Sequence, residues 1–507
     1  MKINQLKAGS LLSYVTLAVG CIIPILYTPV MLSILGQNAY GLYALTNSVV
    51  SYLGLLNFGM GSAVIRYVTM YRAKNRIEDI RRLLGLFTVI FGILSLLVCV
   101  GGVVLIIFAG PLFGQGLTGE EIATMRVLLA VLTAHTAISF PMSIYFSTVI
   151  SYERYLFHKL LALIETIAAP IINLALLYAG FGVIGLAAGT IVTGLISSLI
   201  YIYYCVKKLG IYPVFNNMPL FILKELAGFC AFVFLSSIVD MLYWATDKVL
   251  IGAMLGSAAV AVYNIGGTFT AMLQNMALSI SSVFSPRVNI MVANNESNDA
   301  LSELLIRIGR LQYLLISLIL SGYIVFGQDF IRLWAGPEYS DAYYVALLTM
   351  IPLSVPLIQN IAFAILMARN EHRFRSIMYA IVAVINLVST WLVLPYFGII
   401  GAAVCTAAAF VLGNGIIMNI YYYRVTGLDI PKFWGNILKM SIVPAIMIAL
   451  GLVLVNTVLP VSSLWVFLGF AAGFTVIFCL LSWLVSMNRY EKELILSLLR
   501  KFLPKKS

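Results

Sequence analysis

Ionisable side chains are scarce in this chain, and basic ones outnumber acidic ones. Aspartate, glutamate, lysine and arginine make up 10% of the 507 residues, with 31 basic residues against 19 acidic ones. Soluble domains carry roughly 25% charged residues, so this composition excludes an ordinary soluble globule. On a soluble protein, the net charge of +12 would suggest a nucleic-acid partner. The charge pattern below explains it differently, and we expect no nucleic acid.

Patterns that bind metals or form disulfides are also missing. The three histidines are dispersed, and the six cysteines include no Cys-x-x-Cys pair. All six cysteines fall in or at the ends of apolar stretches, so we interpret them as small buried apolar residues. We therefore expect no metal and no disulfide framework. The cysteines are Cys21, Cys99, Cys205, Cys230, Cys405 and Cys479.

Features of an enzyme are absent too. No Gly-x-x-x-x-Gly-Lys-Ser/Thr run is present, so we expect no nucleotide and no other cofactor. A polytopic polymerase or ligase would need an active site outside the membrane, usually on a substantial external loop. The longest external gap, 327–341, is short and contains no histidine. We therefore expect that the protein is not an enzyme.

The chain instead contains a series of long apolar runs. Apolar residues make up 62% of the sequence, and a run of about 20 such residues spans a bilayer as a helix. The pattern predicts an all-α integral membrane protein with about fourteen transmembrane helices. The predicted spans are 9–35, 41–64, 83–109, 123–150, 160–179, 183–206, 226–250, 257–283, 308–326, 342–367, 376–394, 400–423, 437–456 and 464–486.

The basic residues fall mainly in alternate gaps between these runs. With the N-terminus inside, the inside gaps hold 28 of the 31 basic residues, and the exceptions are Arg126, Lys248 and Arg332. Lysine and arginine in short loops resist translocation, so the bias predicts that both termini lie in the cytoplasm. Topology, together with attraction to anionic lipid headgroups, then accounts for the positive charge.

Two short motifs occur twice. The frame at 35–43 shares Leu, Gly, Ala and Tyr with 255–263, at an offset of 220 residues. An Ile-Asn-Leu element followed by Phe-Gly-x-Ile-Gly-x-Ala and a Thr occupies 172–190 and returns at 385–406. A Phe also follows a basic inside loop in both copies, at Phe157 and Phe374. These matches predict an internal duplication of a six-span unit.

The duplication predicts the domain organisation. We expect an N-terminal six-helix bundle at 1–210, a C-terminal six-helix bundle at 211–432, two additional transmembrane helices at 433–487, and a cytoplasmic amphipathic tail at 488–507. Six spans is an even number, so both copies share one orientation. Parallel repeats of this kind build transporters whose halves rock around a central cavity. A static scaffold is the alternative interpretation.

Together these elements resemble the multidrug/oligosaccharidyl-lipid/polysaccharide (MOP) exporter superfamily. Within it, the chain is similar to the polysaccharide transporter branch, which includes the O-antigen and capsule repeat-unit flippases. The resemblance is carried by the 35–43 frame, the segment 244–252 leading into 255–263, and the two Phe-Gly turns. It covers the whole chain. It implies two six-helix bundles forming a V-shaped cavity, plus two C-terminal helices, and transport by alternating access.

The resemblance also implies a function and a location. The expected activity is a flippase that moves a polyprenyl-diphosphate-linked oligosaccharide from the cytoplasmic to the outer leaflet of the bacterial inner membrane, for surface polysaccharide biosynthesis. Expected partners are this lipid-linked oligosaccharide and membrane lipids, with the polysaccharide polymerase machinery as a further candidate. Because fold alone does not select a substrate, a cation-coupled drug or metabolite antiporter of the same superfamily is the alternative.

The seventh span carries the most informative polar residues. Asp240 and Asp247 share a helix face with Trp244 between them, and Lys248 follows near the outer end. Polar groups inside the bilayer usually face a cavity or a partner. In one interpretation Asp240 takes a coupling ion and Lys248 attracts diphosphate from a cavity wall. In the other, Asp247 and Lys248 form an interfacial charge pair and Asp240 hydrogen-bonds in helix packing.

The eighth span carries a polar stripe along one helix face. Such a stripe could line the cavity and bind sugar hydroxyls, or it could pack helices together, as small and hydroxyl residues do in membranes. The stripe consists of Asn264, Thr268, Asn275, Ser279 and Ser282.

Four further residues are candidates. His135 could relay protons or be a satisfied packing histidine. Glu165 could be an ion-coupling gate carboxylate or an interfacial partner of a basic loop. Arg66 and Arg287 end spans 2 and 8 at nearly equivalent places in the two halves. They are candidates for receiving a diphosphate headgroup, and the alternative is that they only anchor the topology.

Overall fold

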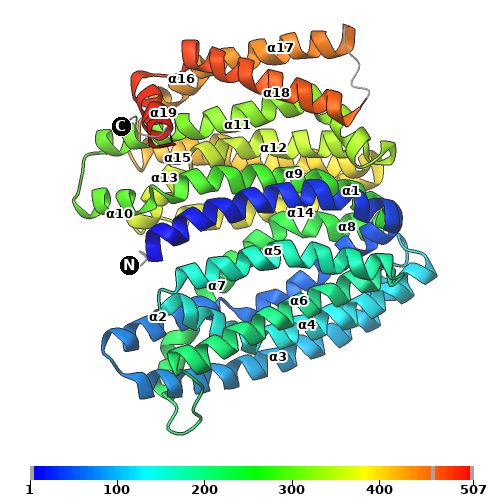
Figure 1. Ribbon diagram of the computed structural model, residues 1–507, viewed down its shortest axis with the longest axis vertical. Coiled ribbons are helices and arrows are strands. Elements are labelled where there is room, and N and C mark those ends of the chain that lie inside the picture. Colours follow the sequence, from blue (N-terminus) through cyan, green and yellow to red (C-terminus); the bar gives the residue numbers. More distant parts are fainter. Residues whose placement is uncertain (1–4, 458–462, 503–507) are drawn as a thin grey trace. The chain divides into compact units, whose positions relative to one another are not determined.

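The computed structural model describes residues 5–457 and 463–502, and within these ranges the chain is helical without a strand (Figure 1). In this part of the chain, eleven helical stretches are long and apolar enough to cross a membrane, or up to twelve if one bent pair counts as a single span. Many large apolar side chains are exposed, among them Leu96, Ile107, Trp391 and Trp465. Such side chains suit contact with lipid. The predicted all-α membrane architecture is confirmed.

The count of fourteen spans stays a prediction, because two helices run on through gaps between predicted spans. Helix α1 (Gln5–Gly54) continues across a kink at Gly36, whose φ is 74° and ψ is 171°. Helix α14 (Arg373–Phe410) continues across a kink at Gly398, with φ 59° and ψ −152°. Only glycine adopts these conformations readily. A glycine thus bends each helix where the sequence predicts a short loop.

The chain divides into two compact units, 1–264 and 265–507. The core of the first unit includes fully buried Phe87 and Phe91 on α3 and buried Phe140 on α4. The predicted domain boundaries at 210 and 432 stay a prediction. The first unit contains α1 (Gln5–Gly54), η1 (Leu55–Asn57), α2 (Met60–Ala73), α3 (Ile77–Phe113), α4 (Gly119–Ser151), α5 (Tyr155–Tyr178), α6 (Gly182–Tyr203), η2 (Tyr204–Leu209), η3 (Leu220–Ile222), α7 (Leu223–Trp244), α8 (Thr246–Met254) and the start of α9.

The second unit contains the rest of α9 and all later helices. One of its cores packs Phe326 of α11 against Phe474 of α18, with ring centroids 5.5 Å apart. Its elements are α9 (Ser257–Ser282), α10 (Ser285–Ala293), α11 (Asn298–Trp334), η4 (Pro337–Tyr339), α12 (Ala342–Ile358), α13 (Asn360–Ala368), α14 (Arg373–Phe410), η5 (Val411–Ile417), α15 (Met418–Arg424), α16 (Ile430–Met440), α17 (Ile442–Thr457), α18 (Leu464–Leu481), η6 (Ser482–Ser486) and α19 (Arg489–Phe502).

Unusual backbone conformations repeat between the two units. Four residues with positive φ in the first half of the chain each have a counterpart with positive φ that lies 216 to 220 positions later, and two of these four pairs contain no glycine. A positive φ is uncommon outside glycine, so matched positions are informative. The duplicated sequence motifs therefore extend to duplicated turns. The pairs are Gly36 with Gly256, Asn75 with Asn295, Glu153 with Asn370, and Gly182 with Gly398.

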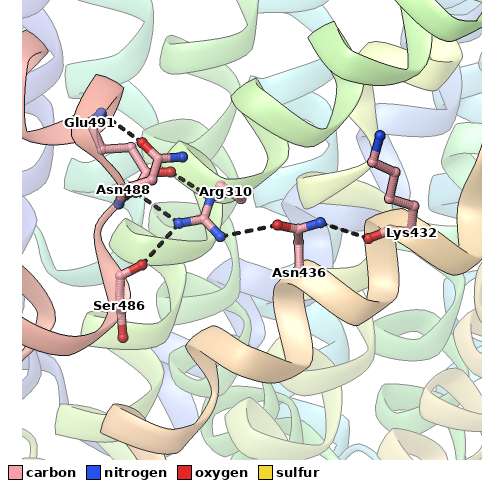
Figure 2. Close-up of polar contacts among 6 residues, drawn as sticks. All are labelled: Arg310, Lys432, Asn436, Ser486, Asn488 and Glu491. Atoms are coloured by element: carbon pink, nitrogen blue, oxygen red, sulfur yellow. Dashed lines mark hydrogen bonds and ion pairs between the residues drawn. The ribbon is translucent and has the colours of Figure 1, made fainter.

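A buried ion pair fixes the C-terminal helix α19 within the second unit (Figure 2). Arg310 on α11 donates to both carboxylate oxygens of Glu491, at 2.6 and 3.0 Å. It also donates to the carbonyl of Ser486 at 2.9 Å and to Asn436 on α16 at 3.3 Å. The side chains of Arg310 and Glu491 are 8% and 1% exposed. Glu491 also accepts from the backbone N–H of Asn488 and caps the start of the helix.

Candidate functional site

Predicted site residues meet in the first unit at a hairpin between α8 and the start of α9. The turn is made by Leu255 and Gly256, whose φ of 91° suits glycine. Across it, the Lys248 Nζ donates to Asn264 Oδ1 at 2.7 Å. The Asn264 Nδ2 in turn donates to the hydroxyl of Tyr40 on α1, also at 2.7 Å. The ammonium of Lys248 is therefore held by a neutral amide, and the phenol of Tyr40 in turn orients that amide.

Asp247 has a different partner on the same hairpin. The hydroxyl of Tyr263 donates to Asp247 Oδ2 at 2.6 Å, and the Asp247 side chain is buried. Next to it, Tyr52 of α1 and Thr246 share a hydrogen bond of 2.6 Å. Asp247 and Lys248 thus each have their own hydrogen-bond partner rather than being held only by each other.

This arrangement leaves Lys248 able to bind an anion. Among the residues that the structure describes, no carboxylate oxygen lies within 4.0 Å of its Nζ. Asn264 uses one of the three donors of the ammonium group. A half-buried cation held by neutral groups attracts an anion more strongly than one in bulk water, because the local dielectric constant is lower. Phosphate fits such a point charge.

Two residues predicted for this wall are not placed in detail. Asp240 and Trp244 belong to α7, but their side chains lie outside the part of the chain that the structure describes. The predicted ion-coupling role of Asp240 and the predicted substrate contact of Trp244 stay predictions.

Three other predicted residues belong to the second unit. In the second unit, Thr268 is half-buried, Asn275 is exposed on α9, and Arg287 is exposed on α10. An exposed Asn275 is consistent with lining open space, as the cavity interpretation of the stripe requires. Their roles in substrate binding stay predictions.

Three predicted residues of the first unit also lie elsewhere. Arg66 on α2 forms an ion pair with Glu225 on α7 at 3.2 Å. Glu165 is half-buried on α5. His135 on α4 packs against α6, because an added Cβ on Gly194 would lie 2.6 Å from its Nε2. This close contact favours the packing interpretation of His135, whereas the coupling role of Glu165 stays a prediction.

The sequence alone missed the tyrosines of the cluster. Tyr40, Tyr52 and Tyr263 all hydrogen-bond to residues of the hairpin or next to it. Tyr263 belongs to the duplicated 255–263 frame, so its place in a repeated motif was the available signal. Tyr40 lies 224 residues from Asn264, and helical periodicity does not reveal such a contact.

The sequence also missed a cationic group in the second unit. The guanidinium of Arg375 on α14 lies 3.7 Å from the ring centroid of Phe363 and 4.3 Å from that of Tyr379. Its Nη2 donates to the Tyr379 hydroxyl at 3.2 Å, and Tyr379 donates to Asn414 in the π-helical segment η5. Stacking on aromatic rings keeps the guanidinium oriented.

Comparisons with known proteins identify the family of this chain. A family model described as "Polysaccharide biosynthesis protein" matches residues 30–344. The chain is 22% identical over 501 residues to the uncharacterized membrane protein EpsK of Bacillus subtilis (strain 168), covering 94% of each chain. It is 20% identical over 395 residues to a putative O-antigen transporter of Shigella flexneri, covering 77% of this chain and 91% of that one.

A solved structure has the same fold. The lipid II flippase MurJ, in an inward closed conformation, matches with a TM-score of 0.72 at 16% identity, over 93% of this chain and 97% of that one. This match confirms the predicted fold. The family model covers more than half of the sequence. The chain therefore belongs to the polysaccharide biosynthesis protein family, in the polysaccharide transporter branch of the MOP exporter superfamily.

Proposed function

We propose that this protein is a flippase that carries a polyprenyl-diphosphate-linked oligosaccharide from the cytoplasmic to the outer leaflet of the inner membrane, for surface polysaccharide biosynthesis. Both termini lie in the cytoplasm in this proposal, as the distribution of basic residues indicates. The six-helix bundles at 1–210 and 211–432 move against each other around a V-shaped cavity. Membrane lipids and the polymerase machinery are its other proposed partners.

The observation that carries the proposal is the near-complete match to the fold of a lipid II flippase, over 93% of this chain. A sequence relative named as a putative O-antigen transporter supports the same class of substrate. The lipid carrier in this proposal has a diphosphate, and translocation requires cations that hold it without trapping it.

Lys248 is the proposed cation for the diphosphate. Its Nζ is bonded to the Asn264 amide at 2.7 Å, and phosphate is a better acceptor for ammonium than an amide oxygen is. An incoming diphosphate could therefore replace or share this bond. Arg66 and Arg287 are the proposed receptors at the cytoplasmic side. Asp247, Asn264, Thr268 and Asn275 are proposed to contact sugar hydroxyls.

Deletion of the gene tests the function directly. We expect lipid-linked oligosaccharide to accumulate in the cytoplasmic leaflet, as measured by mass spectrometry and by accessibility to a membrane-impermeant sugar oxidant. The wild-type gene should restore export. No accumulation, together with hypersensitivity to cationic drugs, would instead support an antiporter.

The role of Lys248 is tested in the same strain. Loss of a charge-assisted hydrogen bond is worth about 1.5–3 kcal/mol, so Lys248→Met should lower the export rate at least about tenfold, and Lys248→Arg should lower it less. Lys74→Met is the matched control, because Lys74 is exposed after α2. Normal export by a variant with neutral residues at Arg66, Arg287 and Lys248 together would refute the phosphate sites.

A further inference from the structure

The second predicted span is broken in the middle. Helix α1 ends at Gly54, a short 3-10 turn covers Leu55–Asn57, and α2 begins at Met60. Between them, Phe58 has φ 50° and Gly59 has φ 68°. A positive φ is uncommon for a bulky residue and is retained at sites where the surrounding structure requires it. Broken backbone at membrane depth is tolerated where it is buried in protein or lines a water-filled cavity.

A cavity lies at this break, within the first unit. Its volume is about 550 Å³, and its lining includes Gly54, Asn57, Gly59 and Ser62 from the broken segment, with Ser237 and Met241 from α7. Pockets for small molecules measure roughly 300–1,000 Å³, whereas a water occupies about 30 Å³. The space is therefore far larger than a single ion or water needs.

The described lining is mainly apolar, with a few polar groups and no charged side chain. Among the residues that the structure describes, the lining includes no Asp, Glu, Lys, Arg or His, so no described side chain of the wall would neutralise an anion. The Oδ1 of Asn57 is buried and has no hydrogen-bond partner among the described residues. The hydroxyl of Ser237 donates to the carbonyl of Val233 at 3.0 Å, which leaves its oxygen as an acceptor. A buried acceptor without a donor is costly, so the cavity suits a neutral ligand that donates hydrogen bonds.

We infer that this cavity is a subsite for one sugar residue of the translocated oligosaccharide. The inference deepens the proposed function and rests on it. Sugar hydroxyls donate hydrogen bonds, which the Asn57 oxygen lacks and the Ser237 oxygen is able to accept. The ring of Phe58, which lies 4.6 Å from that of Phe234, supplies apolar surface beside the cavity. This subsite recognises the glycan, while the Lys248 cluster recognises the diphosphate.

The test fills the cavity without straining the backbone. Gly54 has φ −60°, and an added Cβ there meets nothing within 4 Å, so Gly54→Leu places a side chain in open space. Gly92→Leu is the matched control, because Gly92 on α3 also has nothing within 4 Å and does not line the cavity. The probe is the repeat-unit oligosaccharide released from the lipid carrier of the producing cell by mild acid.

The measurement is calorimetric titration of the purified full chain in detergent. We expect Gly54→Leu to raise the Kd for the oligosaccharide at least about tenfold, and Gly92→Leu to leave it within about twofold. Asn57→Leu, which removes the acceptor and leaves the cavity open, should also weaken binding. An unchanged Kd in Gly54→Leu, or no binding by the wild type, would overturn the inference.

A second probe separates this inference from the proposed function. Polyprenyl diphosphate without sugar should bind Gly54→Leu as well as it binds the wild type. If both probes were weakened equally, the variant would act through general distortion and the sugar assignment would be rejected. If the wild type bound the oligosaccharide but gene deletion caused no inner-leaflet accumulation, the flippase proposal would fail while the sugar subsite would be supported.

Discussion

The two units carry the same aromatic frame. In the first, Phe157 stacks on Tyr204 with ring centroids 4.0 Å apart and planes at 14°. In the second, Phe374 stacks on Tyr421 at 4.3 Å and 6°. Both phenylalanines follow a turn at a matched residue with positive φ, Glu153 or Asn370. The duplication has therefore conserved the packing at this end of each unit.

The side chain next to the stacked phenylalanine differs between the units. His158 packs edge-on against Phe146, with centroids 4.9 Å apart, and hydrogen-bonds Tyr201. The matching position holds Arg375, whose guanidinium lies over Phe363. An imidazole is a titratable group, whereas a guanidinium always carries charge. The aromatic stacking is shared between the two units, and the permanent charge at the neighbouring position is not. At this place the units therefore differ in side-chain chemistry more than in packing geometry.

The two units also differ in buried charge, and the largest expected effect on stability concerns the buried ion pair of Arg310 and Glu491 in the second unit. Among the described ion pairs of the first unit, none is buried to this degree. Removing one partner leaves an uncompensated buried charge, so Arg310→Met should lower the free energy of unfolding by about 3–5 kcal/mol. Equilibrium unfolding in mixed micelles measures it.

Two further variants test the cause. Replacing both partners, as Arg310→Met with Glu491→Leu, should cost less than either single change, because no charge is then left buried alone. Arg489→Gln breaks an exposed pair with Glu493 and should change stability by about 1 kcal/mol or less. If the double variant were as unstable as the sum of the two single variants, an unpaired charge would not be the cause.

A smaller effect compares matched glycine turns. Gly36→Ala introduces a side chain at φ 74° in open space, so only the backbone conformation is penalised, by about 1–3 kcal/mol. At Gly256 the φ is 91°, and an added Cβ would also lie 2.6 Å from the carbonyl oxygen of Gly116. Gly256→Ala should therefore destabilise more than Gly36→Ala in the same unfolding assay.

A helical glycine provides the control for both turns. Gly435 on α16 has nothing within 4 Å of an added Cβ, so Gly435→Ala should be neutral or stabilise by up to about 1 kcal/mol. Equal losses at Gly36 and Gly256 would contradict the role given to the Gly116 contact.

A third comparison concerns the Arg375 guanidinium of the second unit. Cation–π contacts are worth about 0.5–2 kcal/mol, so Arg375→Gln should lower stability by about 1–2 kcal/mol. Arg373→Gln is the matched control on the same helical turn, because Arg373 is exposed and should change stability by no more than about 0.5 kcal/mol. A similar loss for both variants would show that the rings contribute nothing specific.

The sequence predicted the helices and the duplication well, for physical reasons. Long apolar runs have few alternatives to a membrane helix, and a glycine needed for positive φ is visible in both copies of a motif. Glycine was an ambiguous signal at Gly36 and Gly398, because it suits a loop between helices and a kink within one helix equally well. The predicted breaks between spans therefore proved to be kinks within continuous helices.

Contacts between distant helices could not be predicted. The sequence placed Lys248 and Asn264 on neighbouring spans, but their hydrogen bond depends on helix rotation, and Tyr40 joins them from another helix. Arg310 counted only as one inside charge, because charge counts set orientation and do not reveal a partner 181 residues away. The break at Leu55–Gly59 has no proline, and glycine at Gly54 and Gly59 did not by itself distinguish a break from a continuous helix.

The smallest expected effect on stability concerns Arg66 and Arg287. Variants at these residues distinguish a topological anchor from a diphosphate-binding residue. Arg66 and Glu225 are 55% and 59% exposed, so Arg66→Gln should cost about 1 kcal/mol or less. Glu225 also offsets the charge that would attract diphosphate. Arg287 has no carboxylate within 4.0 Å in the described ranges. Arg287→Gln should therefore reduce export more than Arg66→Gln does.

Glu225→Gln tests whether the Glu225 carboxylate competes with diphosphate for Arg66. Without the carboxylate, Arg66 would be available to phosphate, and export should become more sensitive to Arg66→Gln than it is in the wild type. Export rates of the wild type, Arg66→Gln, Glu225→Gln and the variant with both changes form the necessary cycle. If Glu225→Gln left the effect of Arg66→Gln unchanged, Arg66 would be only a topological anchor, and the two units would differ in their phosphate contacts as they do at His158 and Arg375.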